Sequence, residues 1–144
     1  MSWKEFEQGN PKLAQFGKRR FGSGVAYLGT VSKNGFPRVH PVSPIINGGE
    51  MYVFMYPTSP KGKDLLERKK YALHCQVEDK DGGHGEFYVR GEGKLVENEE
   101  IWEKLRSGKV KEMKEKYILF SLSIDFAFSM IYDGDTIVKN SWKS

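Results

Sequence analysis

The order of apolar and polar positions along the chain predicts a protein made mainly of short strands. Alternation with a period of two places every second side chain on one face of a strand. Segments of this kind lie at residues 24–32, 50–56, 71–77, 86–96 and 136–142. In the segment 71–77, the apolar face would hold Tyr71, Leu73, Cys75 and Val77, which predicts a buried thiol at Cys75.

The longest alternation, from Ile118 to Met130, is the strongest strand signal in the chain. We expect one face to carry Ile118, Phe120, Leu122, Ile124, Phe126, Phe128 and Met130. The other face would carry Ser121, Ser123, Asp125, Ala127 and Ser129. A barrel exterior of such small residues is either wetted or packed against something flat. A second subunit is a reasonable occupant, because most soluble oligomers are two-fold homodimers.

Turns join these strands directly to one another. Glycine-containing turns at 33–35, 47–49 and 133–135 connect consecutive strands, so we expect an antiparallel sheet. Residues 36–46 are extended but contain three prolines, which predicts a bulged or edge strand.

Helices are few and are marked by capping residues. We expect one after Asn10, one after Ser59 and one after Asn98, because asparagine and serine accept hydrogen bonds from a helix N-terminus. The second of these helices would turn Leu65 and Leu66 toward the core. About seven strands with short flanking helices would most simply close into a small antiparallel β-barrel, mainly β in class.

Composition agrees with one globular domain spanning residues 1–144, with 38% hydrophobic and 29% charged residues. No apolar run is long enough to cross a membrane, and the polar N-terminal stretch has no signal-peptide core. The single Cys75 excludes an intramolecular disulfide, so we expect a cytoplasmic location. The net charge of +4 favours anionic partners in general.

Lys61 and Lys63 stand in the first turn of the helix that Ser59 would cap, where the helix dipole is positive. A phosphate bound at that helix end would account for both lysines, because free backbone N–H groups there bind anions. A charge-assisted bond to phosphate contributes about 1.5–3 kcal/mol. Dipole repulsion costs only about 0.3–1 kcal/mol per exposed lysine. The alternative is a pair of solvated lysines whose small cost is tolerated.

Six stretches follow one another in a set order between residues 23 and 106. They are GFPRVHPVSPI, an NGG turn, an aromatic strand, TSPKGKDL, YALHCQV and GEFYVRGEGKLV. This order resembles the pyridoxamine 5′-phosphate oxidase-like family of FMN-binding split barrels. The resemblance implies a split-barrel fold and FMN held in a groove between two subunits of a homodimer.

The resemblance also implies which residues contact the flavin. The cation for the FMN phosphate would be Arg38, and the segment that follows it would line the isoalloxazine ring. The third strand would end beside the flavin, the helix start would bind the phosphate, and Glu86 stands where the family has a glutamine. The full set is Arg38, Val39, His40, Pro41, Val42, Ser43, Phe54, Met55, Ser59, Lys61, Lys63 and Glu86.

The chain also departs from the oxidases that give the family its name. Those enzymes hold their substrate phosphate with a Tyr, Arg and Ser set on a helix after the fifth strand, and they end in an Arg-rich segment. Residues 98–117 show no such set, and the chain ends in VKNSWKS. We therefore expect a flavin-dependent oxidoreductase that acts on a different small molecule.

Other functions are compatible with the sequence. One is a non-catalytic flavin carrier of the same fold, and another is the use of deazaflavin or haem in the same groove. A third is a basic barrel that binds single-stranded nucleic acid through strand aromatics. His74 and His84 have no partners at metal-ligand spacing, so no metal site is predicted. Trp142 would either cover the flavin or anchor the C-terminal tail.

Overall fold

The computed structural model describes all 144 residues, which form nine strands and five short helices. The helices are α1 (Trp3–Gly9), α2 (Pro11–Gly22), α3 (Pro60–Arg68), α4 (Glu99–Leu105) and α5 (Val110–Lys116). The strands are β1 (Ala26–Val31), β2 (Pro37–Val42), β3 (Ile45–Asn47), β4 (Glu50–Met55), β5 (Lys70–Cys75), β6 (Glu86–Leu95), β7 (Ile118–Leu122), β8 (Phe126–Asp133) and β9 (Thr136–Lys143). No helix is both long enough and apolar enough to span a bilayer.

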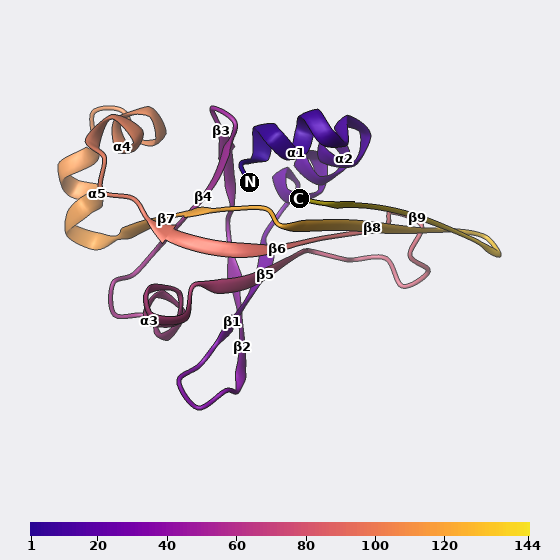
Figure 1. The fold of residues 1–144 in the computed structure, drawn as a ribbon, viewed down its shortest axis with the longest axis horizontal. Coiled ribbons are helices and arrows are strands. Elements are labelled where there is room, and N and C mark those ends of the chain that lie inside the picture. Colours follow the sequence, from indigo (N-terminus) through magenta and orange to yellow (C-terminus); the bar gives the residue numbers. More distant parts are fainter.

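The strands form one curved antiparallel sheet that divides at β6, as a split barrel does (Figure 1). The main order is β2-β1-β5-β6-β7-β4-β3, and β8 and β9 branch from β6. The first half of β6 pairs with β8, and its last residues, Gly93–Leu95, pair with β7. The chain crosses between these partners at Gly91, where a methyl group would collide with the carbonyl oxygen of Ser123. The glycine is therefore required by the close approach of the two backbones.

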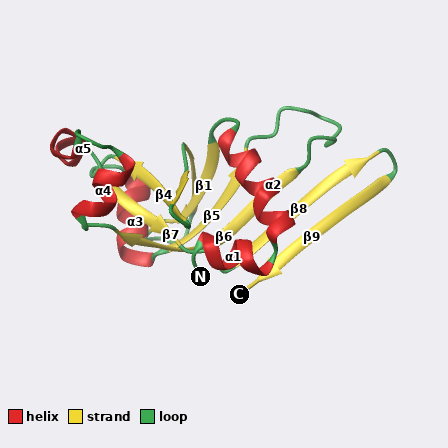
Figure 2. Cartoon of the chain, turned by 90° about the horizontal axis from the view of Figure 1, so that it is seen from above, coloured by secondary structure: helices red, strands yellow, loops and turns green.

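The core lies on the inner side of this curved sheet. Leu28, Leu73, Val89 and Ala127 are cross-strand neighbours on β1, β5, β6 and β8, and each is fully buried. The helices α1 and α2 cover the β6–β8 part of this side (Figure 2). There Phe87 is surrounded by the aromatic rings of Trp3, Phe6, Phe16 and Phe21.

The predicted helix caps are confirmed. The side chain of Asn10 accepts from the backbone N–H of Leu13 at 3.2 Å, and that of Asn98 accepts from Glu100 at 2.9 Å. The amide of Asn10 also donates to Asn140 and to the carbonyl oxygen of Ser141, so it ties the N-terminal helices to β9. Trp142, on the same strand, packs against Phe6 with ring centroids 5.1 Å apart. Its indole therefore anchors the C-terminal strand.

The prediction of a mainly β antiparallel barrel with short helices is confirmed, although nine strands form rather than about seven. Residues 36–46 contribute to two strands, β2 and β3, and Pro44 lies in the break between them, where it need not donate to a ladder. The first of them, β2, is an edge strand, as its prolines required.

The prediction of one continuous strand from Ile118 to Met130 is wrong. Residues 123–125 leave the ladder between β7 and β8, and the side-chain phase shifts across this break. Ala127 and Ser129 consequently face the core, whereas the three apolar residues Phe126, Phe128 and Met130 are half-exposed on the outer side. The sheet exterior here is apolar rather than small and polar.

Two smaller predictions also fail. Leu65 is buried, but Leu66 is 47% exposed, because only the Leu65 side of α3 faces the sheet. Cys75 is buried as expected, but β5 ends there, and Val77 lies in the following loop with 44% of its surface exposed.

Candidate functional site

A groove of about 560 Å³ lies where β2 and β4 end and β3 begins, beside α3 and the α4–α5 segment. Its lining residues are mostly apolar and include two cations, Lys61 and Arg106, and no carboxylate. The full set is Pro41, Val42, Ser43, Pro44, Ile45, Phe54, Met55, Tyr56, Lys61, Arg106, Met113 and Tyr117. Such a lining suits a flat, largely apolar molecule that carries negative charge.

One end of the groove is the N-terminus of α3. The Ser59 hydroxyl caps this helix by accepting from the N–H of Gly62 at 3.2 Å, and it donates to the carbonyl oxygen of Tyr56 at 2.8 Å. Lys61 follows, only 8% exposed and with no carboxylate in ion-pair distance. Burial lowers the pKa of Lys61, and no neighbouring charge offsets that effect. An anion at this helix end would supply the missing counter-charge.

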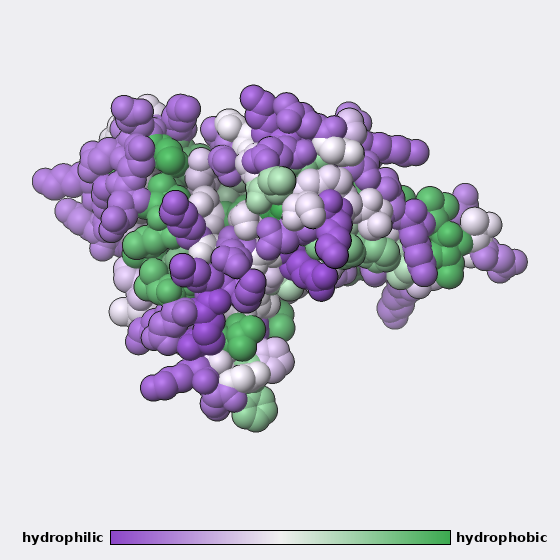
Figure 3. All heavy atoms as spheres, viewed as in Figure 1, coloured by the Kyte–Doolittle hydropathy of each residue, from purple (hydrophilic) through white to green (hydrophobic).

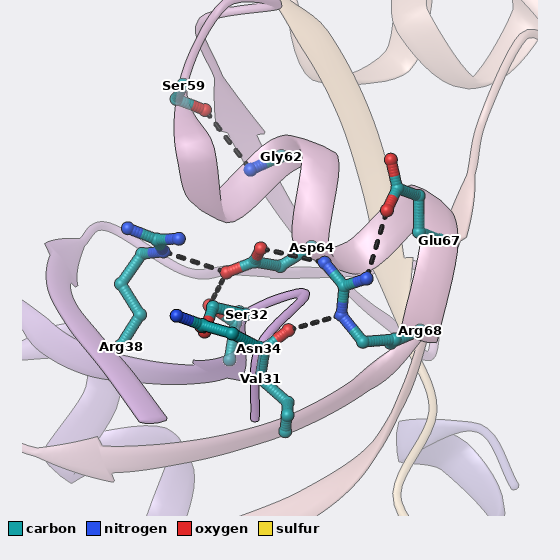
Figure 4. Close-up of polar contacts among 10 residues, drawn as sticks. Val31, Ser32, Asn34, Arg38, Ser59, Gly62, Asp64, Glu67 and Arg68 are labelled. Atoms are coloured by element: carbon teal, nitrogen blue, oxygen red, sulfur yellow. Dashed lines mark hydrogen bonds and ion pairs between the residues drawn. The ribbon is translucent and has the colours of Figure 1, made fainter. Parts of the chain in front are cut away.

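Arg38 lies beside the same helix. Its Nε donates to Oδ2 of Asp64 at 2.8 Å, while its two terminal nitrogens make no hydrogen bond. Asp64 is 4% exposed and also accepts from Thr30 at 2.8 Å and from Arg68 at 3.1 Å (Figure 4). Burial alone would raise the pKa of Asp64, but the hydrogen bonds from Arg38, Thr30 and Arg68 outweigh it and hold the pKa below its usual value.

Aromatic and cationic groups form the other end of the groove. The Arg106 guanidinium lies over the ring of Phe54, 5.0 Å from its centroid, and the Phe54 ring also meets Trp102 edge-on. Tyr56 and Tyr117 stack with their centroids 5.2 Å apart. Aromatic faces of this kind can hold a planar ring system.

The structure brings many of the predicted site residues together. Six line the groove directly, and Ser59 caps the helix on which Lys61 lies. Those six are Pro41, Val42, Ser43, Phe54, Met55 and Lys61. Arg38 reaches α3 through Asp64, and His40 is exposed on the same face of β2 as Arg38. Lys63 is on the exposed side of α3.

Val39 and Glu86 are not brought to the groove within one chain. Val39 points to the opposite face of β2 from Arg38 and is 67% exposed. Glu86 lies at the far end of β6, paired with Met130, on the outer side of the sheet. Both residues therefore lie away from the groove of their own chain.

Several groups of the site were not expected from the sequence. Asp64 and Arg68 pair at the i, i+4 spacing of a helix, a signal that the segment KDLLER does contain. Arg106 and Tyr117 carry no such signal, because tertiary packing of the α4–α5 segment alone brings them beside β4.

Comparison with known proteins places this geometry in context. Residues 12–135 match the family model for pyridoxamine 5′-phosphate oxidase. No curated protein sequence matches the chain.

Solved structures show the same fold at low sequence identity. A haem-binding protein from Mycobacterium smegmatis superposes with a TM-score of 0.70 and 13% identity over 91% of this chain. The chain spans only 58% of that protein's length. A NimC/NimA family protein from Clostridium acetobutylicum has a TM-score of 0.64 and 17% identity, covering 94% of this chain and 93% of its own. PhzG from Burkholderia lata, bound to tetrahydrophenazine-1-carboxylic acid, has a TM-score of 0.63 and 10% identity, covering 99% and 93%.

Proposed function

Because the chain belongs to the pyridoxamine 5′-phosphate oxidase family, we propose that it is a flavoprotein that binds FMN in the groove and transfers hydride or electrons to a small molecule. One observation carries the proposal. Lys61 is a buried cation without a counter-charge, at a helix N-terminus that opens into an apolar groove free of carboxylates. A buried, unpaired charge is costly, and a phosphate at this position would remove the cost.

The chemical character of the lining residues fits FMN, with cations for its phosphate and apolar side chains for its ring system. Its phosphate would be held by the side chain and backbone N–H of Lys61 and by the free terminal nitrogens of Arg38. Its ring system would lie along the apolar lining near Phe54 and Met55. The flavin, when bound, supplies the redox chemistry. The chain would bind and orient it and exclude water from its face.

Absorption of the purified protein in the visible region tests the proposal, with the released cofactor identified by mass. We expect a flavin spectrum that is lost when Arg38→Ala and Lys61→Ala are combined, with the fold retained. A Soret band would indicate haem instead, and a deazaflavin would be recognised by its mass. Full flavin occupancy in the double variant would refute the phosphate site.

Catalysis is tested separately from binding. Reduction of the bound flavin by NADH or NADPH, followed by turnover on candidate acceptors, is expected for an oxidoreductase. Bound flavin that is neither reduced nor turned over would identify a carrier. Oligonucleotide binding with a steep salt dependence, in a protein without any cofactor, would favour the nucleic-acid alternative.

We further propose that the working unit is a homodimer joined through the outer face of the sheet. The cross-strand neighbours Tyr27, His74, Tyr88 and Phe128 form a continuous, partly exposed row on β1, β5, β6 and β8. Ile137, near the tip of the β8–β9 hairpin and cross-strand from Tyr132, is on the same face and is 51% exposed (Figure 3). Such a face commonly marks a protein contact. A second copy on it would bring Val39 and Glu86 toward a groove.

A further inference from the structure

Asp64 is a buried carboxylate shared by three donors from three different elements. Its Oδ2 accepts from Oγ1 of Thr30 on β1 and from Nε of Arg38 on β2, each at 2.8 Å. Its Oδ1 accepts from Arg68, one turn further along α3, at 3.1 Å. Figure 4 shows Arg38 and Arg68 approaching the carboxylate from opposite sides. The cluster connects the edge of the sheet to the helix that begins at the groove.

Arg38 depends on this cluster for its position. It is on the edge strand β2 between Pro37 and Pro41, and its side chain is 37% exposed. An arginine in such a place has many rotamers, and fixing one of them costs side-chain entropy. The bond from Nε to Asp64 fixes the guanidinium plane. It leaves both terminal nitrogens free for a ligand.

Asp64 by itself would cancel the charge of Arg38, and Arg68 prevents this. Arg68 donates to the second oxygen of Asp64, and it is held in place by the carbonyl oxygen of Val31 at 2.6 Å and by Glu67 at 2.9 Å. Two guanidinium groups contact the buried Asp64 carboxylate, whereas the Glu67 carboxylate that pairs with Arg68 is 59% exposed and screened by solvent, so positive charge exceeds negative charge in the buried part of the cluster. The excess charge is carried on the side of Arg38 that lies away from Asp64.

We propose that Asp64 is a positioning residue for an anion clamp, in which it orients Arg38 toward the ligand phosphate while Arg68 preserves the positive charge. The inference rests on the proposed function, since the anion is the FMN phosphate. The inference adds that Asp64 and Arg68, which do not themselves touch the ligand, set the affinity for the phosphate.

Comparison of FMN with riboflavin, which lacks the phosphate, tests the clamp. Both dissociation constants are measured by quenching of flavin fluorescence, in wild type and in Asp64→Asn. We expect FMN to bind at least tenfold more weakly to the variant, while riboflavin binding changes by less than twofold. A purely structural role would weaken both ligands alike, and that result would overturn the proposal. An unchanged FMN affinity would also overturn it.

Three further variants keep the test decisive if Asp64→Asn does not fold. Arg68→Gln removes the second cation and should selectively weaken FMN, whereas Arg68→Lys should restore much of the loss. Thr30→Val is the matched control, because it removes a neutral donor to Asp64 but leaves both charges around the carboxylate. Its ratio of FMN to riboflavin affinity should equal that of wild type. Equal ratios in Arg68→Gln and wild type would contradict the clamp.

The wild-type measurement separates this proposal from the proposed function. Wild-type protein that binds neither flavin would remove the proposed function itself. Wild-type protein that prefers FMN, together with variants that keep the same preference, would remove only the clamp.

Discussion

Lys61 combines burial with the absence of a counter-charge, and it does so at the positive end of a helix dipole. From the sequence, a bound anion and a pair of solvated lysines were both open, and the helix-dipole argument applied to Lys61 and Lys63 alike. The structure separates them, since Lys63 is exposed and only Lys61 lines the groove. The difference follows from the helical angle of 100° per residue, which turns consecutive odd positions to different sides of α3.

Substitution Lys61→Met should weaken FMN binding and leave the ligand-free protein at least as stable as wild type. Loss of one charge-assisted bond of about 1.5–3 kcal/mol corresponds to a roughly ten- to hundredfold rise in Kd. The uncharged side chain keeps the packing of the lysine stem and removes a charge that burial disfavours. Fluorescence titration and thermal unfolding without flavin measure the two effects. A clear drop in the melting temperature would show that the lysine is structural.

The lowered pKa of Lys61 also predicts how FMN binding depends on pH. The folded, ligand-free protein disfavours the charged amine, so the burial cost is fully present below the lowered pKa. It is relieved as the pH rises toward the value of an unfolded lysine. The charged amine is also the form that attracts the phosphate. FMN affinity should therefore fall on the alkaline side at a lower pH than an ordinary lysine would cause.

The matched variant for this titration is Lys61→Arg, whose guanidinium stays charged over the whole range. Its FMN affinity should not show the alkaline fall attributed to the lysine. Identical pH profiles for both proteins would assign the fall to the flavin or to another group.

At the scale of elements, the main error of the sequence reading arises where a strand changes phase. Hydrophobic alternation from Ile118 to Met130 is unbroken in the sequence, yet the chain leaves the ladder at 123–125. The cause is tertiary, because Ser123 and Asp125 donate their N–H groups to Glu92 and Arg90 of β6 as the sheet bends. A local pattern cannot reveal a bend that is imposed by another strand. Caps, turns and the edge position of β2 were predictable because their causes are local.

The same bend predicts unequal effects of two glycine substitutions in strands. Gly91→Ala would push a methyl group into the backbone of Ser123, which cannot rotate away, so we expect a loss of about 1–3 kcal/mol in the free energy of unfolding. Gly29→Ala, in β1, meets nothing closer than the Ala72 carbonyl oxygen at 3.7 Å. Gly29→Ala should change the free energy of unfolding by no more than about 0.5 kcal/mol. Urea unfolding followed by tryptophan fluorescence compares them, and equal losses would mean that β6 can relax at Gly91.

Two asparagine caps allow a second comparison between elements. The side chain of Asn98 only caps α4, so Asn98→Ala should lower the free energy of unfolding by about 1 kcal/mol. Asn10 caps α2 and also bonds to Asn140 and Ser141 of β9, so Asn10→Ala should cost about 2 kcal/mol. Equal costs in urea unfolding would show that the bonds to β9 contribute nothing to stability.

At the scale of the whole molecule, the sequence was informative about the fold and about one end of the site. The order of strands and turns predicted an antiparallel barrel, the helix-start motif indicated Ser59 and Lys61, and the family resemblance implied Arg38. The wall formed by Arg106 and Tyr117 could not be predicted, because the position of the α4–α5 segment depends on packing over a separate small core around Trp102. Val39 and Glu86 lie away from the groove of their own chain, and only the proposed dimer would bring them toward one, which no pattern within one chain describes.

The dimer proposal leads to a prediction about the outer face of the sheet. Phe128 is partly exposed and is the β8 member of the outer-face row, so Phe128→Glu would place a charge where the two sheets of the proposed dimer meet without destabilising the monomer core. A stable dimer buries about 800 Å² on each partner, and a desolvated carboxylate in that interface should split it. Light scattering should show a shift from dimer to monomer, accompanied by weaker FMN binding, because the partner's share of the site is lost.

The control Gln15→Glu adds the same charge at an exposed position of α2, on the other side of the sheet, and should leave the molar mass measured by light scattering unchanged. A wild-type protein that is monomeric yet fully loaded with flavin would show that one chain completes the site, with Val39 and Glu86 outside it.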